Sequence, residues 1–368
     1  MTRVPEDYTT VQQAIDAASD AEEIVIGEGN HVATSALVIG NKSLTLSGRG
    51  PRSTWLISQG FQDTNAGIRH DDPAVGPDKW LRLRNLSVAI AGPLEGTVVN
   101  VKRPSQPSSE DRNLMVEHVT IDALGEGSYY RTALVHEHCW NVRMTDVLTH
   151  NQAGALTAGV VSRGRCVGAK YEEVVVYDAE NADAFRVEGP NAEGHVWVDC
   201  SSPQCRRGIV VELPLSELGQ PSPGWVIRNF HADVFNTPVF LQNVAQFVVE
   251  GLLYRTTTAT DIWDGLALVG TCRQGRVNVD FVNNSANNGP ARAGESCGIW
   301  GVVNYAALND VDITARGGAL FQVVRLQSGA RYDNVHDCRA TNLIAGGVVV
   351  KNLSGYASPP DMVLRDNY

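Results

Sequence analysis

The chain has 368 residues, of which 43% are apolar and only 19% charged, with 35 glycines and a formal net charge of -11. Its length allows one long domain or two to three ordinary ones, and its composition favours strands and turns over helices. The acidic charge argues against nucleic acid or an anionic membrane as a partner, because lysine and arginine must neutralise phosphates.

The N-terminus and the cysteines indicate which compartment and which kinds of site to expect. We find no signal-peptide pattern and no apolar run approaching about 18 residues, so we expect no membrane insertion. Seven cysteines occur without a CxxC pair, which argues against a disulfide framework or a zinc site. We therefore expect free buried thiols, as in a reducing compartment, with no metal and no cofactor.

The first predicted element is a short amphipathic helix within residues 8–20. Thr9 and Gln12 have the spacing of a capping box. The residues that share one apolar helical face are Tyr8, Val11, Ile15 and Ala18. We expect this helix to cover the apolar end of the structure that follows and to protect its open edge.

After the helix, a polar residue followed by a short alternating apolar stretch returns about every 22 to 33 residues. In "VEHVTI", for example, His118 precedes Val119 and Ile121. The ten reference residues, in chain order, are Asn85, His118, Asp146, Glu173, Asp199, Asn229, Gly251, Asp280, Asp310 and Asn334. Alternation with period 2 indicates strands with one buried face, and the intervening Gly, Asn, Asp and Pro indicate turns.

Two or three short strands per repeat predict an all-β fold, a right-handed parallel β-helix of about 10–12 coils with the N-terminal capping helix. A propeller blade needs about 40 residues, and a leucine-rich repeat needs a leucine frame that is absent. We expect the reference residues to turn the backbone and to hydrogen-bond from coil to coil. We assign residues 1–40 to the cap helix and first coil and residues 41–368 to the β-helix, in a single domain.

Three N-terminal segments, "YTTVQQAIDAAS", "IVIGEGNH" and "ALVIGNKSLTLSGRG", resemble the opening of the pectin-lyase-like β-helix superfamily, although His31 replaces the usual tyrosine. The final "MVLRDNY" resembles the end of the β-helix in many phage tail and virion proteins. The catalytic patterns of polygalacturonase-type hydrolases, pectin methylesterases and calcium-dependent pectate lyases have no convincing copy here. The resemblance therefore implies the fold, and points to a virion protein that is commonly a homotrimer.

Counting four residues beyond each reference residue predicts a column of outward side chains that could hold a sugar chain lengthwise. Its members are Asp122, His150, Tyr177, Asp233, Arg255 and Asn284. Two coils separate Asp122 from Asp178, roughly 9.6 Å at the spacing of strands, which is at the wide end for an inverting glycoside hydrolase. Asp183 could replace either carboxylate. For an enzyme, the candidate catalytic residues are thus Asp122, Asp178 and Asp183.

Aromatic faces backed by polar groups are typical of sugar-binding surfaces. The candidate glycan-binding residues are Tyr129 and Tyr130 in the predicted loop "GEGSYYR", Trp263 in "TDIWDG", and His150 and Tyr177 in the column. The alternative for each is packing at a coil corner or ordinary surface exposure. The phrase "HEHCW" invites a metal interpretation, but no third ligand with zinc spacing is visible.

Three functional hypotheses remain. The first, which we prefer, is a phage-like virion structural protein that presents its β-helix on the particle surface for attachment to host-surface glycans. Its partners would be other virion proteins, two further copies of the chain and a host polysaccharide. The second is a polysaccharide depolymerase, a hydrolase or lyase with an acidic site on the β-helix flank. The third is a cellular carbohydrate-active enzyme, which the lack of a secretion signal disfavours.

Overall fold

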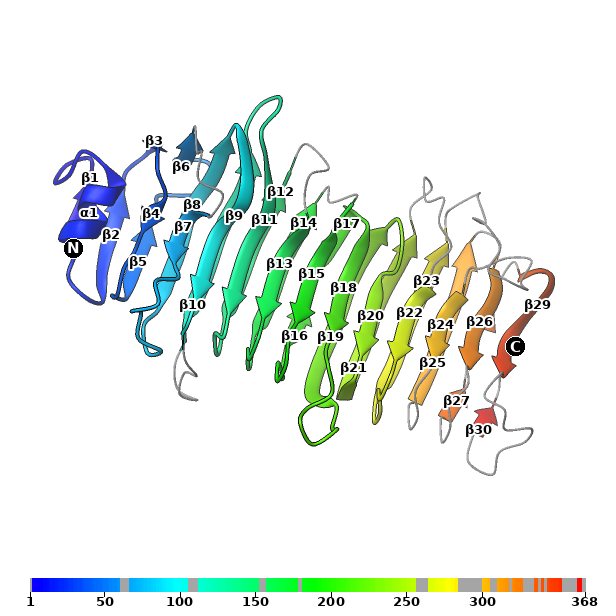
Figure 1. Cartoon of the computed structure of the whole chain (residues 1–368). Helices are drawn as coiled ribbons and strands as arrows, with labels where there is room; N and C mark the ends of the chain where they lie inside the picture. Colours follow the sequence, from blue (N-terminus) through cyan, green and yellow to red (C-terminus); the bar gives the residue numbers. More distant parts are fainter. Residues whose placement is uncertain are drawn as a thin grey trace. The chain divides into compact units, whose positions relative to one another are not determined.

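The structure is a computed structural model in which the chain divides into two compact units, Met1–Arg186 (unit 1) and Val187–Tyr368 (unit 2). It describes residues 2–59, 66–104, 112–151, 157–177, 181–255, 264–283, 300–304, 310–317, 320–326, 334–336, 339–340, 343–352 and 363–365. Figure 1 gives the element labels used below. The assignment of residues 1–40 and 41–368 to one domain stays a prediction.

In unit 1 the chain alternates between two parallel sheets. One sheet holds β1 (Thr2–Val4), β2 (Glu22–Ile26), β3 (Gly29–Ala33), β5 (Leu44–Ser47), β6 (Thr54–Gln59), β8 (Leu81–Ala91), β10 (Leu114–Ala123), β12 (Arg143–His150) and β14 (Lys170–Tyr177). The other holds β4 (Leu37–Val38), β7 (Ala66–His70), β9 (Pro93–Lys102), β11 (Tyr129–Glu137), β13 (Ala158–Arg163) and β15 (Asp183–Glu188). Because β10 pairs with β12 and β11 pairs with β13, each pair of successive strands completes one coil.

Unit 2 repeats this alternation. One sheet holds β16 (Val196–Val198), β17 (Ser201–Cys205), β19 (Ser222–Val234), β21 (Val244–Arg255), β23 (Arg276–Asn283), β25 (Asp310–Gly317), β27 (Asn334–His336), β28 (Arg339–Ala340) and β30 (Val363–Arg365). The other holds β18 (Arg207–Glu212), β20 (Val239–Gln242), β22 (Asp264–Val269), β24 (Trp300–Asn304), β26 (Leu320–Leu326) and β29 (Leu343–Asn352). The predicted right-handed parallel β-helix is confirmed.

The core consists of apolar side chains stacked from coil to coil. Val119 of β10 lies opposite Val147 of β12, which lies opposite Val174 of β14, and all three are at most 1% exposed. Burying each such side chain stabilises the fold by roughly 1.5–3 kcal/mol. The intervening residues of the same strands point outward, which is why the sequence alternates with period 2.

The recurrent polar residue of each repeat adopts the left-handed backbone conformation. The φ angle lies between 49° and 55° at Asn85, His118, Asp146, Glu173, Asp199 and Asn229. Asparagine and aspartate tolerate this conformation because their short polar side chains hydrogen-bond locally. The turn residue interrupts the pairing of neighbouring coils. Glu117 pairs with Thr145 and Val119 with Val147, whereas His118 and Asp146 between them are not paired. The predicted turn role is confirmed for these six residues.

Side chains at these turns also bond to the neighbouring coil, as predicted. His118 Nδ1 lies 2.8 Å from Asp146 Oδ2, and the imidazole must be the donor because a carboxylate only accepts. In unit 2, Asn229 Nδ2 donates to Asp199 Oδ1 at 2.5 Å. The turn residues therefore form short polar ladders along the outside of each unit.

The predicted register is wrong in the later coils. Gly251 lies opposite Phe230 rather than Asn229, because β19 has one extra residue between Ile227 and Phe230 relative to β21. Farther along, Arg276 rather than Asp280 lies opposite Asp310. A one-residue shift cannot be counted from turn phrases alone, since the loops between them vary in length.

The N-terminal cap is present, although its details differ from the prediction. Helix α1 (Val11–Ala17) begins one residue later than expected, because Thr10 is the N-cap and Gln13 the N3 residue of its capping box. Val11 and Ile15 are buried as predicted. Lys42 Nζ donates to the carbonyl oxygen of Ile15, which lies near the C-terminal end of the helix, at 2.9 Å. Strand β1, which we had not expected, pairs in parallel with β2.

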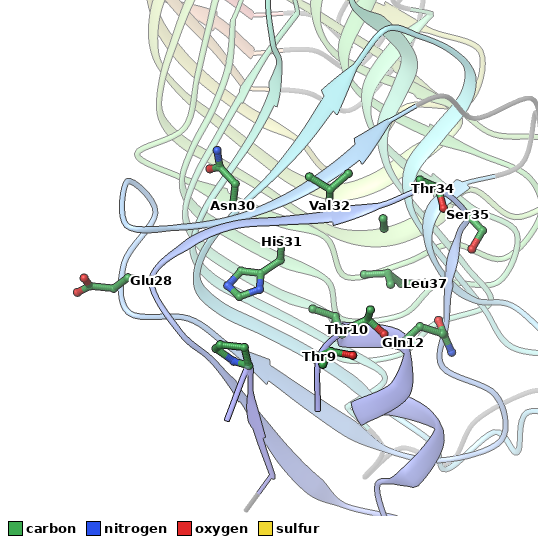
Figure 2. Close-up of a pocket in the computed structure, with 13 residues that line it drawn as sticks. Thr9, Thr10, Gln12, Glu28, Asn30, His31, Val32, Thr34, Ser35 and Leu37 are labelled. Atoms are coloured by element: carbon green, nitrogen blue, oxygen red, sulfur yellow. The ribbon is translucent and has the colours of Figure 1, made fainter. Parts of the chain in front are cut away.

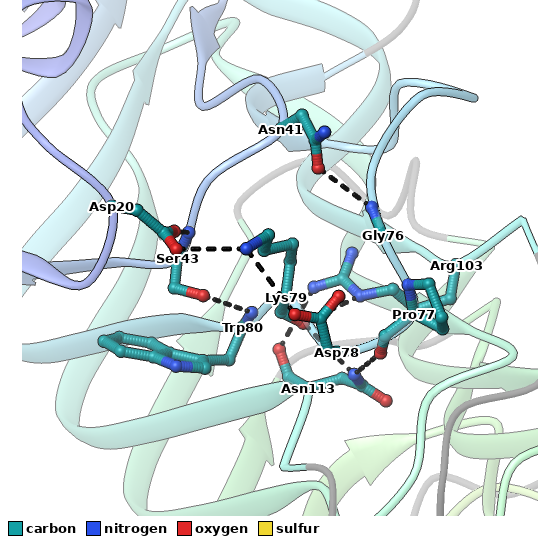
Figure 3. Close-up of polar contacts among 10 residues, drawn as sticks. All are labelled: Asp20, Asn41, Ser43, Gly76, Pro77, Asp78, Lys79, Trp80, Arg103 and Asn113. Carbon is teal, nitrogen blue, oxygen red and sulfur yellow. Dashed lines mark hydrogen bonds and ion pairs between the residues drawn. The ribbon is translucent and has the colours of Figure 1, made fainter.

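A buried arginine organises the loop that precedes β8 (Figure 3). Arg103 is fully buried and donates to the carbonyl oxygens of His70 and Lys79, both at 3.0 Å. Asn113 Nδ2 donates to the carbonyl oxygens of Pro77 and Lys79 at 2.7 and 3.1 Å. Burial and the neighbouring Arg103 charge lower the pKa of His70 to about 3, so this histidine is neutral. Backbone carbonyls, rather than carboxylates, thus solvate the guanidinium.

The cysteines are structural in the part of the chain that is described. Cys139, Cys166, Cys200, Cys205 and Cys272 are buried and form no disulfide, as expected. Burial raises the pKa of Cys166 and of Cys272 to about 11, so both thiols are protonated near neutral pH. They fill space in the core and are poor nucleophiles.

Candidate functional site

Three predicted residues form a continuous column on the outer surface of unit 1. Asp122 lies opposite His150, and His150 lies opposite Tyr177, at the ends of β10, β12 and β14. His150 Nδ1 donates to Asp122 Oδ1 at 2.9 Å, and the His150 and Tyr177 rings lie 5.6 Å apart at 43°. We call these three residues the first flank. Each stands four residues beyond a left-handed turn, so alternation directs all three outward.

A second histidine–aspartate pair lies at the turns of the same coils, with the two residue types exchanged between the strands. Here the histidine, His118, is on β10 and the aspartate, Asp146, is on β12, with side chains 56% and 61% exposed. Leu148 lies between the two pairs on β12 and is 40% exposed. The surface thus offers hydrogen-bond donors and acceptors around an apolar centre, which is the chemistry that a sugar ring requires.

Tyr129 belongs to a polar cluster at the start of β11. Its hydroxyl donates to Glu95, and Arg131 Nη2 forms an ion pair with Glu95 Oε2 at 2.7 Å. The Arg131 guanidinium lies 5.4 Å from the centre of the Tyr129 ring. The hydrogen bond to the Glu95 carboxylate raises the pKa of Tyr129, and the same bond lowers the pKa of Glu95. The half-buried Tyr129 side chain is therefore held by Glu95 at its hydroxyl and by Arg131 at its ring.

Tyr130 is not a surface residue. It lies inside β11 rather than in a loop, it is fully buried, and its hydroxyl donates to the His150 carbonyl oxygen at 2.9 Å. Burial raises the pKa of Tyr130 well above its ordinary value. The expectation that Tyr130 contacts a glycan is therefore wrong. Its position beneath the first flank instead supports the backbone of His150.

Among the described residues, Asp183 does not join the first flank. Asp183 is at the start of β15 in the other sheet, is 2% exposed, and lies 3.5 Å from Arg186. Asp178 and Trp263 lie outside the described residues. The structure therefore brings Asp122, His150 and Tyr177 together, and withdraws Asp183 from solvent.

Unit 2 carries a related surface, which we call the second flank and which consists of His231, Asp233 and Tyr254. Asp233 of β19 lies opposite Tyr254 of β21, whereas the predicted partner Arg255 lies opposite Val234. The His231 and Tyr254 rings lie 6.4 Å apart, edge to face. Asp233 was part of the predicted column, yet nothing in the sequence distinguished it from its neighbours.

The environment of Asp233 differs from that of Asp122. Asp233 Oδ1 is buried without a hydrogen-bond partner among the described residues. Desolvation raises the pKa of Asp233, and the nearby His231 opposes this effect. A carboxyl group in this state holds its proton more tightly than an ordinary aspartate does.

Two further histidines, His136 and His195, are in the interior. His136 of "HEHCW" is fully buried, with Nε2 2.7 Å from the Tyr171 hydroxyl. His195 stacks against both Trp197 and Trp225, with ring centres 5.8 and 5.0 Å away, and burial lowers its pKa to about 4. Within the described parts of the chain, no group of three or more His, Cys, Asp or Glu residues is arranged to hold a metal ion.

The winding of the strands defines the class of fold as a right-handed parallel β-helix. Neither a protein-family model nor a curated protein matches the sequence. None of the helices in the described residues is long and apolar enough to cross a lipid bilayer.

Solved structures share this fold at low sequence identity. The chain aligns over 96% of its length with 53% of bacteriophage CBA120 tailspike protein 3, at 12% identity and a TM-score of 0.59. It aligns over 97% with 94% of the A-module of the Azotobacter vinelandii mannuronan C-5 epimerase AlgE6, at 13% identity and a TM-score of 0.55. The chain thus spans about half the length of the tailspike and nearly all of the epimerase module.

Proposed function

We propose that the protein is a phage-like virion component that binds a host-surface polysaccharide along the first flank. The observation that carries this proposal is the unbroken column of Asp122, His150 and Tyr177 on three successive coils. Strands repeat about every 4.8 Å, so the column offers one polar or aromatic group at each step along an extended glycan. The carboxylate accepts, the imidazole donates and the tyrosine ring provides a stacking face.

The likeness to a bacteriophage tailspike supports the virion setting. On this proposal the partners are other virion proteins and two further copies of the chain in a homotrimer. Sedimentation of the purified protein at micromolar concentration tests the trimer, and a monomer would contradict it. Tyr129 adds a second aromatic surface to the glycan site, held by Glu95 and Arg131.

Glycan binding can be tested by calorimetry with capsular and lipopolysaccharide preparations. We expect Tyr177→Ala to weaken binding about two- to tenfold, because stacking of an aromatic ring contributes about 0.5–1.5 kcal/mol beyond its buried area. Tyr8→Ala, which removes an aromatic ring that belongs to neither flank, is the control and should leave binding unchanged. If Tyr177→Ala binds as well as the wild type, the first flank is not the glycan site.

Polysaccharide cleavage is a second candidate function, favoured by Asp233. A glycosidase acid must hold a proton until it transfers it to the leaving oxygen, and partial burial without a partner favours this protonated form. The described surroundings of Asp233 do not identify the group that would activate water. The fold likeness to a polysaccharide-modifying epimerase makes such an activity chemically reasonable.

Cleavage is tested by incubating the protein with the same polysaccharides and measuring new reducing ends or unsaturated products. If Asp233 is the acid, Asp233→Asn abolishes the products and Asp122→Asn retains them. Asp178→Asn and Asp183→Asn test the other two predicted carboxylates. Products that survive Asp233→Asn but disappear with Asp122→Asn would move catalysis to the first flank. No products from any preparation would leave attachment as the function.

A further inference from the structure

The first coil of unit 1 consists of the strands β2, β3 and β4. Other parts of the chain cover the outer edges of β2 and β4. Strand β1 pairs along β2, from Thr2 opposite Ile24 to Val4 opposite Ile26. At β4, the Gln12 side chain takes the place of a strand, because its Nε2 donates to the Val38 carbonyl at 3.2 Å and its Oε1 accepts from the Val38 amide at 2.9 Å. Both edges are thereby closed to further pairing.

The third strand, β3, is paired on one side only. Among the described strands it pairs with β6, and its other edge has no partner strand. The Gly29 amide donates to the Ser53 carbonyl oxygen at 2.7 Å, on the β6 side. Because backbone groups alternate along a strand, the amides and carbonyls of Asn30 and Val32 point to the opposite, open edge. An open edge of this kind is a template for strand addition.

A pocket of about 470 Å³ lies along β3 (Figure 2). Figure 2 shows His31 and Val32 on one side of it and Thr9, Thr10 and Gln12 at the start of α1 on the other. Val32 is 51% exposed, although it is a large apolar residue. The pocket therefore combines unpaired backbone groups with an exposed apolar side chain.

The charge around this pocket has one sign. The only lysine, arginine, aspartate or glutamate among its lining residues is the exposed Glu28. An adjoining hollow, which shares Thr9, is lined by Asp7 and Asp16 and again by no lysine or arginine. A partner that enters these two hollows therefore meets carboxylates and no lysine or arginine among their lining residues.

We propose that the open edge of β3 is a docking site for an extended basic peptide segment of a partner protein, which adds to β3 as a further parallel or antiparallel strand. The partner backbone would bond to Asn30 and Val32, its apolar side chains would pack on Val32, and its lysine or arginine side chains would face Glu28. This proposal is independent of the glycan site, since none of its residues belongs to either flank.

The test uses the full chain and a fluorescent synthetic peptide that alternates lysine and valine, with a glutamate–valine peptide for comparison. We expect the lysine peptide to bind more tightly, and to slow hydrogen exchange of the Asn30 and Val32 amides. Equal binding of the two peptides, or binding without protection of these amides, would overturn the proposal. Protection of the same amides by polysaccharide, or by raising the protein concentration alone, would assign the edge to a glycan or to a second copy instead.

Two variants with matched controls locate the contact. Val32→Pro removes the outward amide at a position where an edge strand tolerates proline, and should weaken the lysine peptide about tenfold. Val32→Ile keeps both the amide and an apolar side chain and should bind within about twofold of the wild type. Glu28→Gln should weaken binding about two- to fivefold, whereas Glu6→Gln, which lines neither hollow, should not. Unchanged binding by Val32→Pro would exclude strand addition.

Discussion

In unit 1 the Asp122 carboxylate accepts a hydrogen bond from His150 on the next coil, whereas in unit 2 Asp233 has an oxygen buried without such a partner. Both aspartates stand four residues beyond a left-handed turn. They differ in their neighbours, because His150 lies directly opposite Asp122, while Pro203 and Tyr254 lie opposite Asp233. The residue across the coil, rather than the residue itself, decides whether the carboxylate accepts a hydrogen bond.

This difference separates two kinds of chemistry on one scaffold. A paired aspartate and histidine form a hydrated, polar surface suited to reversible binding of hydroxyl groups. An aspartate that retains its proton is suited to proton donation. The first flank therefore supports attachment, and the second flank is where we would look for cleavage.

The largest expected effect on stability tests the buried His195 in the interior of unit 2. Because the pKa of His195 is lowered to about 4, the unfolded chain binds a proton more readily, and stability is lost as the pH falls from about 6.5 to about 4. We expect urea unfolding to show a loss of about 3 kcal/mol from this residue between pH 7 and pH 4. His195→Phe should remove that loss.

Trp197→Phe is the control for this experiment. It disturbs the same aromatic stack but keeps the histidine, so the protein should be less stable at every pH and still lose stability in acid. An acid dependence that persists in His195→Phe would show that other groups, such as the neutral His70 in unit 1, account for it.

A smaller effect on stability should have opposite signs for substitutions of Asp233 and Asp122. The raised pKa of Asp233 means that the folded protein binds the proton more tightly than the unfolded chain, so this residue disfavours folding once the pH exceeds its pKa. Asp233→Asn should therefore stabilise the protein at pH 7, by up to about 1 kcal/mol. Asp122→Asn breaks a partly exposed pair and should destabilise it by less than about 1 kcal/mol. Stabilisation by both substitutions would remove the distinction between the flanks.

The smallest expected effect tests what raises the pKa of Asp233. Removing the imidazole in His231→Ala should raise the pKa of Asp233 further, because His231 lowers it in the wild type. Carboxyl carbon resonances measured against pH report this value directly. Phe240→Leu in the other sheet of unit 2 is a control that should leave the pKa of Asp233 unchanged. A fall in the Asp233 pKa on loss of His231 would mean that burial is not the main cause.

The outward column could be predicted only in part. Asp122, His150 and Tyr177 were found because three consecutive repeats have nearly equal lengths, so counting from the turn keeps the register. The count failed at Arg255, because the extra residue in β19 moves Tyr254 into the position opposite Asp233. Tyr130 was misplaced because a strand begins at Tyr129, and the alternation there directs every second side chain inward.

The sequence by itself determined the β-helix and its turns, since period-2 alternation and a recurring polar residue with a left-handed backbone are local properties that each repeat carries. Only the tertiary structure decided which side chains meet across coils. Among the described residues, whether Asp122 meets a histidine, whether one oxygen of Asp233 is left without a hydrogen-bond partner and whether β3 has an open edge depend on register between strands 20 or more residues apart. Loop lengths set that register, and no local pattern encodes it.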